Sequence, residues 1–350
     1  MSRCKPAFFM MVKQFIFISL ATVMFACGSN TEPDNSNATS SDTSLSTVDA
    51  QEDSLNKVLR EDPNNEEAYI LRGRLKYNQS KFQGALGDAK RALEVDTTNP
   101  EALLLAGEAY FSMDDYFASQ KSFENCIAAN KKYSPCFEKL AEINLLRKNY
   151  DKAMGYVNDA LRIDERNYYP YYLKGWIYQE RGDSATAASS FQTSVELKPD
   201  FYDGYIMLGS LYYNENHPLC VQYFSTALEI LPSSTEAMYF LGMYYQNNLK
   251  PTEALSVYKR MMEVDASDVR PLYNSGFINL TQTENFDSAI TYFDAAISLN
   301  PEYHQAYYNR GLAYLEKGDK SKAVLDFQKA IDINRDYTLA IKALNKIQGS

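Results

Sequence analysis

The chain of 350 residues has little of the material on which catalysis or metal binding usually depends. It contains two histidines, one tryptophan and five cysteines, so neither a histidine-based active site nor a metal cluster is expected. Glycine-rich phosphate loops, a His-Glu-x-x-His pattern and paired Cys-x-x-Cys motifs are also missing from the sequence. We therefore predict no enzyme, no catalytic residue, no metal site and no cofactor.

Positive charge is also in short supply. The 35 Lys and Arg residues face 45 Asp and Glu, which gives a net charge of -10. Nucleic-acid-binding proteins need a basic face, so no nucleic-acid partner is expected. The hydrophobic share of 45% excludes disorder throughout the chain. What the sequence has in excess is tyrosine, with 28 residues, and that excess needs an explanation.

The longest apolar run, residues 15–26, lies near the N-terminus and is too short to span a bilayer, which takes about 20 residues. The basic residues Arg3, Lys5 and Lys13 precede it, as in a secretory signal peptide. Met10 or Met11 would serve equally as the true start and would give a shorter basic region.

The apolar run ends at Ala26-Cys27, which resembles the lipobox of bacterial lipoproteins, although Met24 stands where that motif usually has Leu. The resemblance implies cleavage after residue 26 and a lipid on Cys27. The alternative is an ordinary signal peptide with a chance cysteine. Residues 28–50 are mostly Ser, Thr, Asn and Asp, and we expect them to form a flexible tether.

From Glu66 onward a small residue recurs at spacings of 34, 34, 34, 34, 33, 34 and 35. We number each unit so that this residue is position 8. Apolar residues then recur at positions 4, 7, 8 and 11, which indicates an amphipathic helix, and a second stripe falls at positions 20, 24 and 27. We expect close approach of two helix backbones at position 8. The small residues are Gly73, Gly107, Ala141, Gly175, Gly209, Gly242, Gly276 and Gly311.

This pattern, clearest over residues 305–331, resembles the tetratricopeptide repeat, and the resemblance covers eight repeats in residues 66–335. It implies an all-α solenoid of stacked helix-turn-helix units forming a right-handed superhelix. The expected order is a signal peptide at 1–26, the lipidated Cys27 and tether at 27–50, an N-terminal capping half-repeat at 51–63, the repeats, and a C-terminal capping helix at 336–350. In that last helix Leu339, Ala340, Ala343, Leu344 and Ile347 are expected to face inward.

The cysteines of the repeats have two interpretations. Cys126 and Cys220 occupy small core positions, which predicts buried thiols. Cys136 follows Cys126 across a tight turn, so in an oxidising compartment this pair is a candidate disulfide.

Nine tyrosines fall at the core positions 4 and 11 of the repeats. In the tetratricopeptide family, partners bind in a concave groove lined by positions 2, 5, 9, 12 and 13 of the first helices. A further set of aromatic residues occupies these positions, and either binds a partner or packs between neighbouring first helices. The set comprises Tyr77, Phe111, Tyr169, Tyr172, Trp176, Tyr213, Tyr239, Tyr273, Phe277 and Tyr308.

Charged residues narrow the kind of partner that this groove would accept. Positions 5 and 9 lack the Lys and Asn that would clamp a C-terminal carboxylate. The early groove holds Glu101, Glu108, Glu138 and Glu142, which favours a basic or neutral segment.

The leading hypothesis is a lipid-anchored scaffold that binds protein or peptide segments in a bacterial envelope complex, with the outer membrane as the expected location. The alternative is a glycan- or peptide-binding, or accessory catalytic, lipoprotein that uses the same aromatic groove. The residues specify neither the partner nor the oligomeric state.

Overall fold

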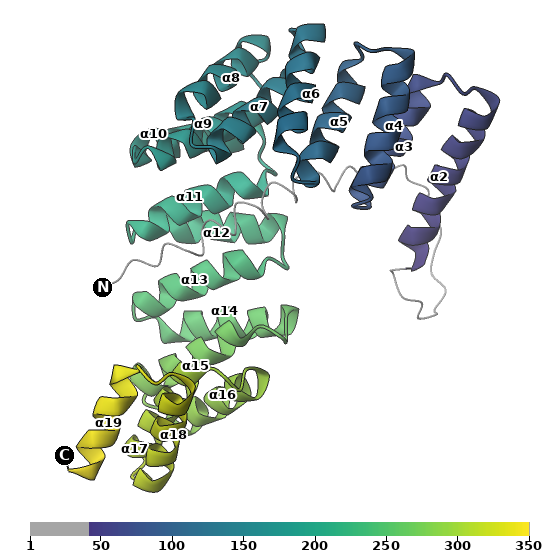
Figure 1. Cartoon of the computed structure of the whole chain (residues 1–350). Helices are drawn as coiled ribbons and strands as arrows, with labels where there is room; N and C mark the ends of the chain where they lie inside the picture. Colours follow the sequence, from purple (N-terminus) through teal and green to yellow (C-terminus); the bar gives the residue numbers. More distant parts are fainter. Residues whose placement is uncertain (1–41, 350) are drawn as a thin grey trace, which may run out of the picture. The chain divides into compact units, whose positions relative to one another are not determined.

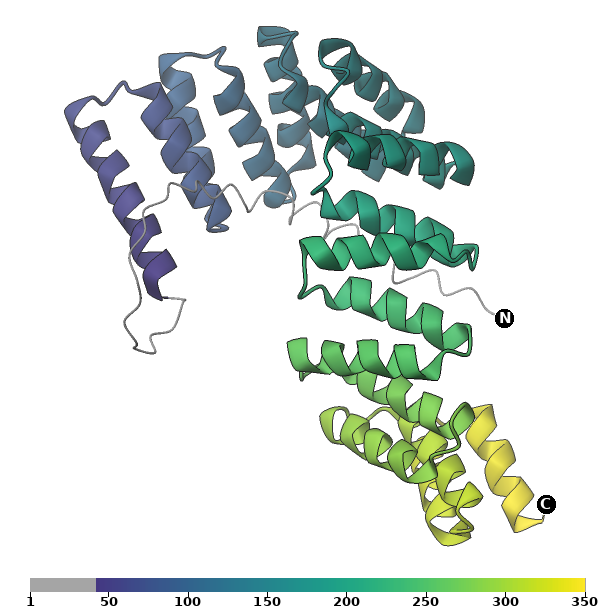
Figure 2. The same cartoon turned by 180° about the vertical axis from the view of Figure 1, so that it is seen from behind.

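The computed structural model describes residues 42–349, with side chains from residue 49 onward, and this part of the chain is all-α, without a strand (Figures 1 and 2). Within it, none of the helices has the length and apolar character needed to cross a membrane. The helices are α2 (Asp42–Glu61), α3 (Glu66–Asn78), α4 (Phe82–Val95), α5 (Pro100–Ser112), α6 (Tyr116–Ala129), α7 (Ser134–Leu146), α8 (Tyr150–Ile163), α9 (Tyr168–Glu180), α10 (Ser184–Leu197), α11 (Tyr202–Asn214), α12 (Leu219–Ile230), α13 (Thr235–Asn247), α14 (Pro251–Val264), α15 (Val269–Thr281), α16 (Phe286–Leu299), α17 (His304–Glu316), α18 (Lys320–Ile333) and α19 (Thr338–Gln348).

The helices belong to two compact units. Unit 1 ends at Leu197 and contains α2 to α10, whereas unit 2 begins at Lys198 and contains α11 to α19. Within each unit the helices follow one another as antiparallel pairs that stack side by side, from α3–α4 to α9–α10 and from α11–α12 to α17–α18 (Figure 1). The predicted all-α, helix-turn-helix architecture is therefore confirmed. The hand of a superhelix stays a prediction.

Local sequence explains where the helices begin and how the pairs turn. The Asn99 side chain accepts hydrogen bonds from the backbone N–H groups of Glu101 and Ala102, which caps α5. The turn between the two helices of each pair contains a residue with positive φ, and only two of these residues are glycines, Gly182 and Gly318. The others adopt the left-handed region at a steric cost. They are Ser80, Asp114, Lys148, Asn216, Leu249 and Glu284.

The small residue at position 8 is held by an aromatic ring. A Cβ atom added to Gly175 would lie 2.6 Å from Phe191 Cδ1, and the glycines of later repeats meet position 24 in the same way. The expectation of close approach was therefore right, but its stated partner was wrong, because the glycine faces a ring and not a second backbone. Two repeats have no ring at position 24. Ala141 carries a methyl group in the repeat whose position 24 is the smaller Val157, whereas the first repeat keeps a glycine at position 8 and has Leu105 of the next repeat as its neighbour.

Both predicted caps need correction. Helix α2 begins at Asp42, so residues 42–50 are helical and do not belong to the tether. Apolar positions 45, 48, 55 and 59 recur at helical spacing, which explains the longer helix. At the other end Leu339 is 51% exposed, although Ala340 and Leu344 are buried. Since successive helical residues lie about 100° apart, Leu339 faces a side of α19 that no other described helix covers.

The signal peptide, Cys27 and residues 28–41 of the tether lie outside the described residues.

Candidate binding surface

The first helix of each pair carries the positions expected to contact a partner. We call the side chains at positions 2, 5, 9, 12 and 13 of these helices the first-helix surface. In unit 1 it belongs to α3, α5, α7 and α9, and in unit 2 to α11, α13, α15 and α17. Neighbouring first helices touch, as α7 and α9 do in unit 1 and α11 and α13 do in unit 2. Side chains at one position in successive repeats can therefore interact.

The predicted aromatic residues divide evenly between the units. Of the ten, Tyr172 is buried, with 6% exposed, and the other nine are partly exposed. Several pack within their own repeat: the ring centroids of Tyr77 and Phe82 lie 5.4 Å apart, and those of Tyr308 and Phe327 lie 5.6 Å apart. Packing therefore accounts for part of this set. Its role in binding stays a prediction.

The two glutamates at position 9 of unit 1 each pair with a basic residue of the same unit. Arg74 Nη1 forms an ion pair with Glu108 Oε2, one repeat further along the chain. Lys139 Nζ lies 2.9 Å from Glu142 Oε1, which also accepts a hydrogen bond of 2.9 Å from the Tyr169 hydroxyl. Two of the four glutamates expected to attract a basic segment are thus neutralised inside the protein.

Burial acts to lower the pKa of Lys139, but the carboxylates of Glu142 and Glu108 outweigh it. The pKa of Lys139 is therefore raised and the ammonium keeps its charge at neutral pH. Glu138 accepts hydrogen bonds of 2.7 Å from Ser134 Oγ and from Asn167 Nδ2. Burial nevertheless raises the pKa of Glu138.

The Trp176 indole nitrogen of unit 1 is buried and has no hydrogen-bond partner. Gln179 Oε1, three residues further along the same helix, is in the same condition. One unused donor and one unused acceptor therefore lie on neighbouring turns of α9.

Unit 2 has a carboxyl group on its first-helix surface that the sequence analysis missed. Asp203, at position 2 of α11, is 8% exposed and makes no hydrogen bond or ion pair within the described residues. Burial raises its pKa to about 6, against the opposing effect of Lys198. The signal was present in the sequence, because position 2 reads Asp203, Glu236 and Arg270 in three successive repeats.

Glu236 occupies position 2 of α13, the next first helix. Burial, with a smaller contribution from the charge of Asp203, raises its pKa to about 7. The Tyr202 hydroxyl interacts with this carboxyl group and lies 2.6 Å from Ser234 Oγ. The two carboxyl groups thus share one electrostatic environment at the start of α11 and α13.

Arg270 is the basic residue near these two carboxyl groups, but its guanidinium binds a different carboxylate. Its guanidinium binds both carboxylate oxygens of Asp268, with Nη2 2.6 Å from Oδ2 and Nε 2.9 Å from Oδ1. The same guanidinium lies 4.8 Å from the ring centroid of Tyr239, within the range of a cation–π contact.

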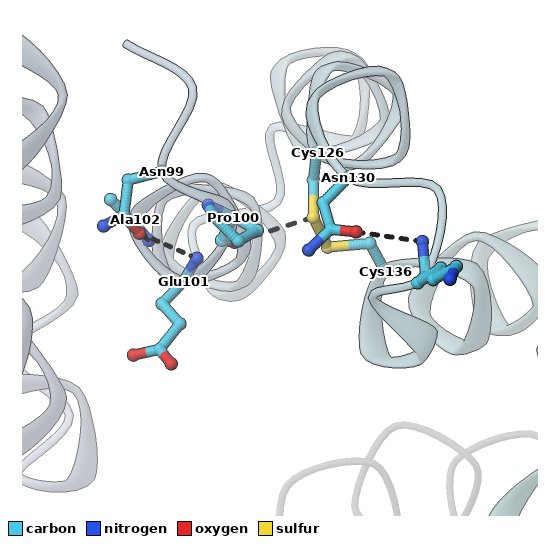
Figure 3. Close-up of a disulfide and its surroundings, with 8 residues drawn as sticks. Asn99, Pro100, Glu101, Ala102, Cys126, Asn130 and Cys136 are labelled. Carbon is cyan, nitrogen blue, oxygen red and sulfur yellow. Dashed lines mark hydrogen bonds between the residues drawn. A yellow bond between two sulfur atoms is a disulfide. The ribbon is translucent and has the colours of Figure 1, made fainter. Parts of the chain in front are cut away.

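Cys126 and Cys136 form a disulfide that joins the end of α6 to the start of α7 (Figure 3). Their Cα atoms lie 6.3 Å apart and both residues are fully buried. Cys126 Sγ lies 3.5 Å from the Pro100 carbonyl oxygen, a packing contact since a disulfide sulfur has no proton to donate. Cys220 is a buried free thiol whose pKa burial raises to about 11.

Two hollows of unit 1 lie away from the first-helix surface. One, of about 540 Å³, is lined by Ile127, Phe137 and Ile163 among others, and the other, of about 840 Å³, lies at the turn between α8 and α9. Within residues 42–349 no group of three or more His, Cys, Asp or Glu side chains is arranged to hold a metal ion.

Comparison with known families identifies the repeated unit. One model of the tetratricopeptide repeat matches residues 70–116 and 279–338, and a second matches residues 100–133 and 168–201. These segments are tetratricopeptide repeats. They occur in both units, and over these residues the predicted resemblance is confirmed.

Relatives of the chain are distant in sequence. Human DnaJ homolog subfamily C member 7 is 22% identical over 298 residues, which cover 76% of this chain and 60% of that protein. Human protein O-mannosyl-transferase TMTC3 is 19% identical over 75% of this chain and 29% of its own length. The chain thus spans less than two thirds of the length of these relatives.

Among solved structures, the chain is similar to YrrB, described as a tetratricopeptide protein with an unusual peptide-binding site. The identity is 24% and the TM-score 0.46, over 53% of this chain and 96% of that one.

Proposed function

We propose that the chain is a scaffold that holds protein or peptide segments on its first-helix surface. The observation that carries this proposal is that nine of the ten predicted aromatic residues stay partly exposed there, whereas position 24 of the repeats holds fully buried rings such as Phe191 and Phe224. Large rigid aromatic side chains lose little conformational entropy on binding and anchor protein interfaces well.

Crosslinking in cells followed by mass spectrometry tests the proposal. The variant Trp176→Ala/Tyr239→Ala/Phe277→Ala removes three partly exposed rings from the surface, and we expect it to lose the partners that the native chain captures. The matched control is Phe117→Ala, which removes a ring that is 84% exposed on α6, a second helix. Equal capture by the triple variant and the native chain would refute the proposal.

We further propose that Cys27 carries a lipid and that the protein works in a bacterial envelope, at the outer membrane. Two features support this location: the signal-like N-terminal sequence that ends at Cys27, and the Cys126–Cys136 disulfide. Disulfides persist in oxidising compartments and are rare in the cytosol. Replacing Cys27 with Ser should release the protein from the membrane fraction. Retention of that variant would contradict the anchor.

The glycan- or peptide-binding alternative differs in one measurable respect. It requires a soluble sugar or peptide to bind the purified chain when no partner protein is present. Calorimetry with purified protein therefore separates the two functions.

A further inference from the structure

Asp203 is the least compensated carboxyl group on the first-helix surface of unit 2. It is nine-tenths buried, yet no N–H or O–H group within the described residues donates to it. Taking a carboxylate out of water without a partner is costly, so buried carboxylates are normally paired or hydrogen-bonded. The structure gives Asp203 the electrostatic influence of Lys198 and no direct contact. The partner that would stabilise its charge is missing.

Glu236 occupies position 2 of the next first helix and adds a second carboxyl group beside Asp203. Helices α11 and α13 are in contact, and Asp203 and Glu236 are the second residues of these two helices. The charge of Asp203 also acts on Glu236, so the two carboxyl groups lie near one another at the start of these helices. The nearby Arg270 does not fill this role, because its guanidinium is held by Asp268 in a two-point contact.

Tyrosines border the site. Tyr202, which precedes Asp203, interacts through its hydroxyl with Glu236 and Ser234. Tyr239, one turn beyond Glu236, holds the Arg270 guanidinium over its ring. That contact shows that the ring of Tyr239 already accepts a cation on one face.

Two buried carboxylates at position 9 of the first helices of unit 1 show what satisfied groups look like in this protein. Glu108 has Arg74 as its partner and Glu142 has Lys139, each from within the chain. Among residues 42–349, no basic side chain forms such a pair with Asp203. A complementary charge from another molecule would restore the arrangement that unit 1 builds internally.

We propose that Asp203 and Glu236 bind one basic side chain, a lysine or an arginine, of a protein segment that lies on the first-helix surface of unit 2. This inference rests on the proposed scaffold function and adds the chemistry of the partner. The carboxylates supply the charge and the hydrogen-bond acceptors, and Tyr202 and Tyr239 contact the apolar stem of the basic side chain.

The test begins with the segment that the native full-length chain captures. Crosslinks formed near unit 2 identify that segment, and synthetic copies of it are made with each Lys or Arg replaced in turn by norleucine. Calorimetry then measures the binding of every copy to the native chain, to Asp203→Asn/Glu236→Gln and to Glu229→Gln/Glu263→Gln. The last variant is the matched control, because it removes exposed carboxylates of unit 2 on the second helices α12 and α14, away from the first-helix surface.

We expect one norleucine copy to bind the native chain at least about tenfold more weakly than the unaltered peptide, a typical loss for a desolvated charge pair. That difference should shrink to about twofold or less in Asp203→Asn/Glu236→Gln and persist in the control. A captured segment without Lys or Arg, or a norleucine effect of equal size in all three proteins, overturns the inference while the scaffold function stands. If the native chain captures no segment, the scaffold function itself fails.

Discussion

The two units build the same surface from the same repeat and treat its charges differently. In unit 1, Arg74 neutralises Glu108 of the next repeat, and Lys139 neutralises Glu142 within α7. In unit 2, Asp203 is buried without a partner and Glu236 interacts with a tyrosine hydroxyl. Charges counted along a repeat sequence therefore overstate the acidity of unit 1 and miss the unpaired carboxyl group of unit 2. What matters is whether a basic side chain, from the same helix or from a neighbouring repeat, lies within reach of each carboxylate.

The largest expected effect comes from breaking a pair in unit 1. Replacing Lys139 with Met leaves the carboxylate of Glu142 buried without a cation, so we expect unit 1 to lose about 3 kcal/mol of stability. The double variant Lys139→Met/Glu142→Met should recover most of this loss, since it removes both charges. Urea unfolding monitored by circular dichroism measures the difference. A single variant as stable as the native chain would show that the pair contributes nothing.

In unit 2 we expect the charged form of the buried carboxyl groups to lower stability, so that removing their charge stabilises the unit. The pKa of Asp203 is raised to about 6 and that of Glu236 to about 7, while Lys198 and Arg270 favour their charged forms. A carboxyl group with a raised native pKa stabilises the fold fully below its unfolded pKa of about 4, and this contribution is lost as the pH rises through the native value. The stability of unit 2 should therefore fall between about pH 4 and pH 8, by an amount on the order of 2–3 kcal/mol.

The variant Asp203→Asn/Glu236→Gln should flatten this pH dependence and be more stable than the native chain at pH 8. Hydrogen exchange of the amides of α11 and α13, corrected for intrinsic rates, measures the effect within unit 2. The control is Glu67→Gln/Glu101→Gln, which should leave the slope unchanged. An unaltered slope in the first variant would show that other groups control it.

The glycine–ring contact, by contrast, should behave alike in the two units. Gly175→Ala places a methyl group against Phe191, and Gly276→Ala places one 2.7 Å from Phe293 Cε1. We expect each substitution to cost about 1–3 kcal/mol through overpacking. Thermal unfolding of the single variants measures the cost. The double variant Gly175→Ala/Phe191→Val, which imitates Ala141 with Val157, should be destabilised by less than the sum of its two single variants.

The smallest expected effect concerns the turns between paired helices. Leu249 is 75% exposed and has φ 54°, and Lys148 of unit 1 has φ 59°. Replacing either residue with Gly should stabilise its unit by about 0.5–1 kcal/mol, because Gly adopts this region without steric cost. Gly182→Ala should have the opposite sign. Thermal midpoints that fall in both Gly variants would mean that these side chains contribute more than the backbone strain costs.

Much of the fold could be predicted because the same residue pattern occurs eight times in the sequence. Positions 8 and 24 can be recognised in the sequence. The contact between them could have been inferred from the third repeat, in which the larger Ala141 at position 8 is combined with the smaller Val157 at position 24. The start of α2 and the exposure of Leu339 were harder, since a terminal helix lacks the neighbour that defines which face is inward.

The sequence predicts which repeat positions form the candidate surface, but not which neighbours each side chain contacts or how deeply it is buried. Lys139 lies at position 6, outside the positions expected to form the groove, and its pairing with Glu142 cancels a charge that the sequence count assigned to the surface. Tyr172 occupies a groove position and yet is buried, because its ring packs against Phe191 at a centroid distance of 5.7 Å. Such outcomes depend on which side chains meet, and a periodic pattern does not contain that information.

The glycine–ring contact also bears on how such a chain can grow. In every repeat from the second onward except the third, which combines Ala141 with Val157, a ring and the glycine that it contacts lie in the same repeat, so a duplicated repeat carries both halves of its own contact. Gly73 differs, because a Cβ at that position would meet Leu105 Cδ2 of the following repeat at 2.6 Å. The first repeat therefore depends on its neighbour. Copies of internal repeats could be gained or lost as units, whereas the first repeat must keep its successor.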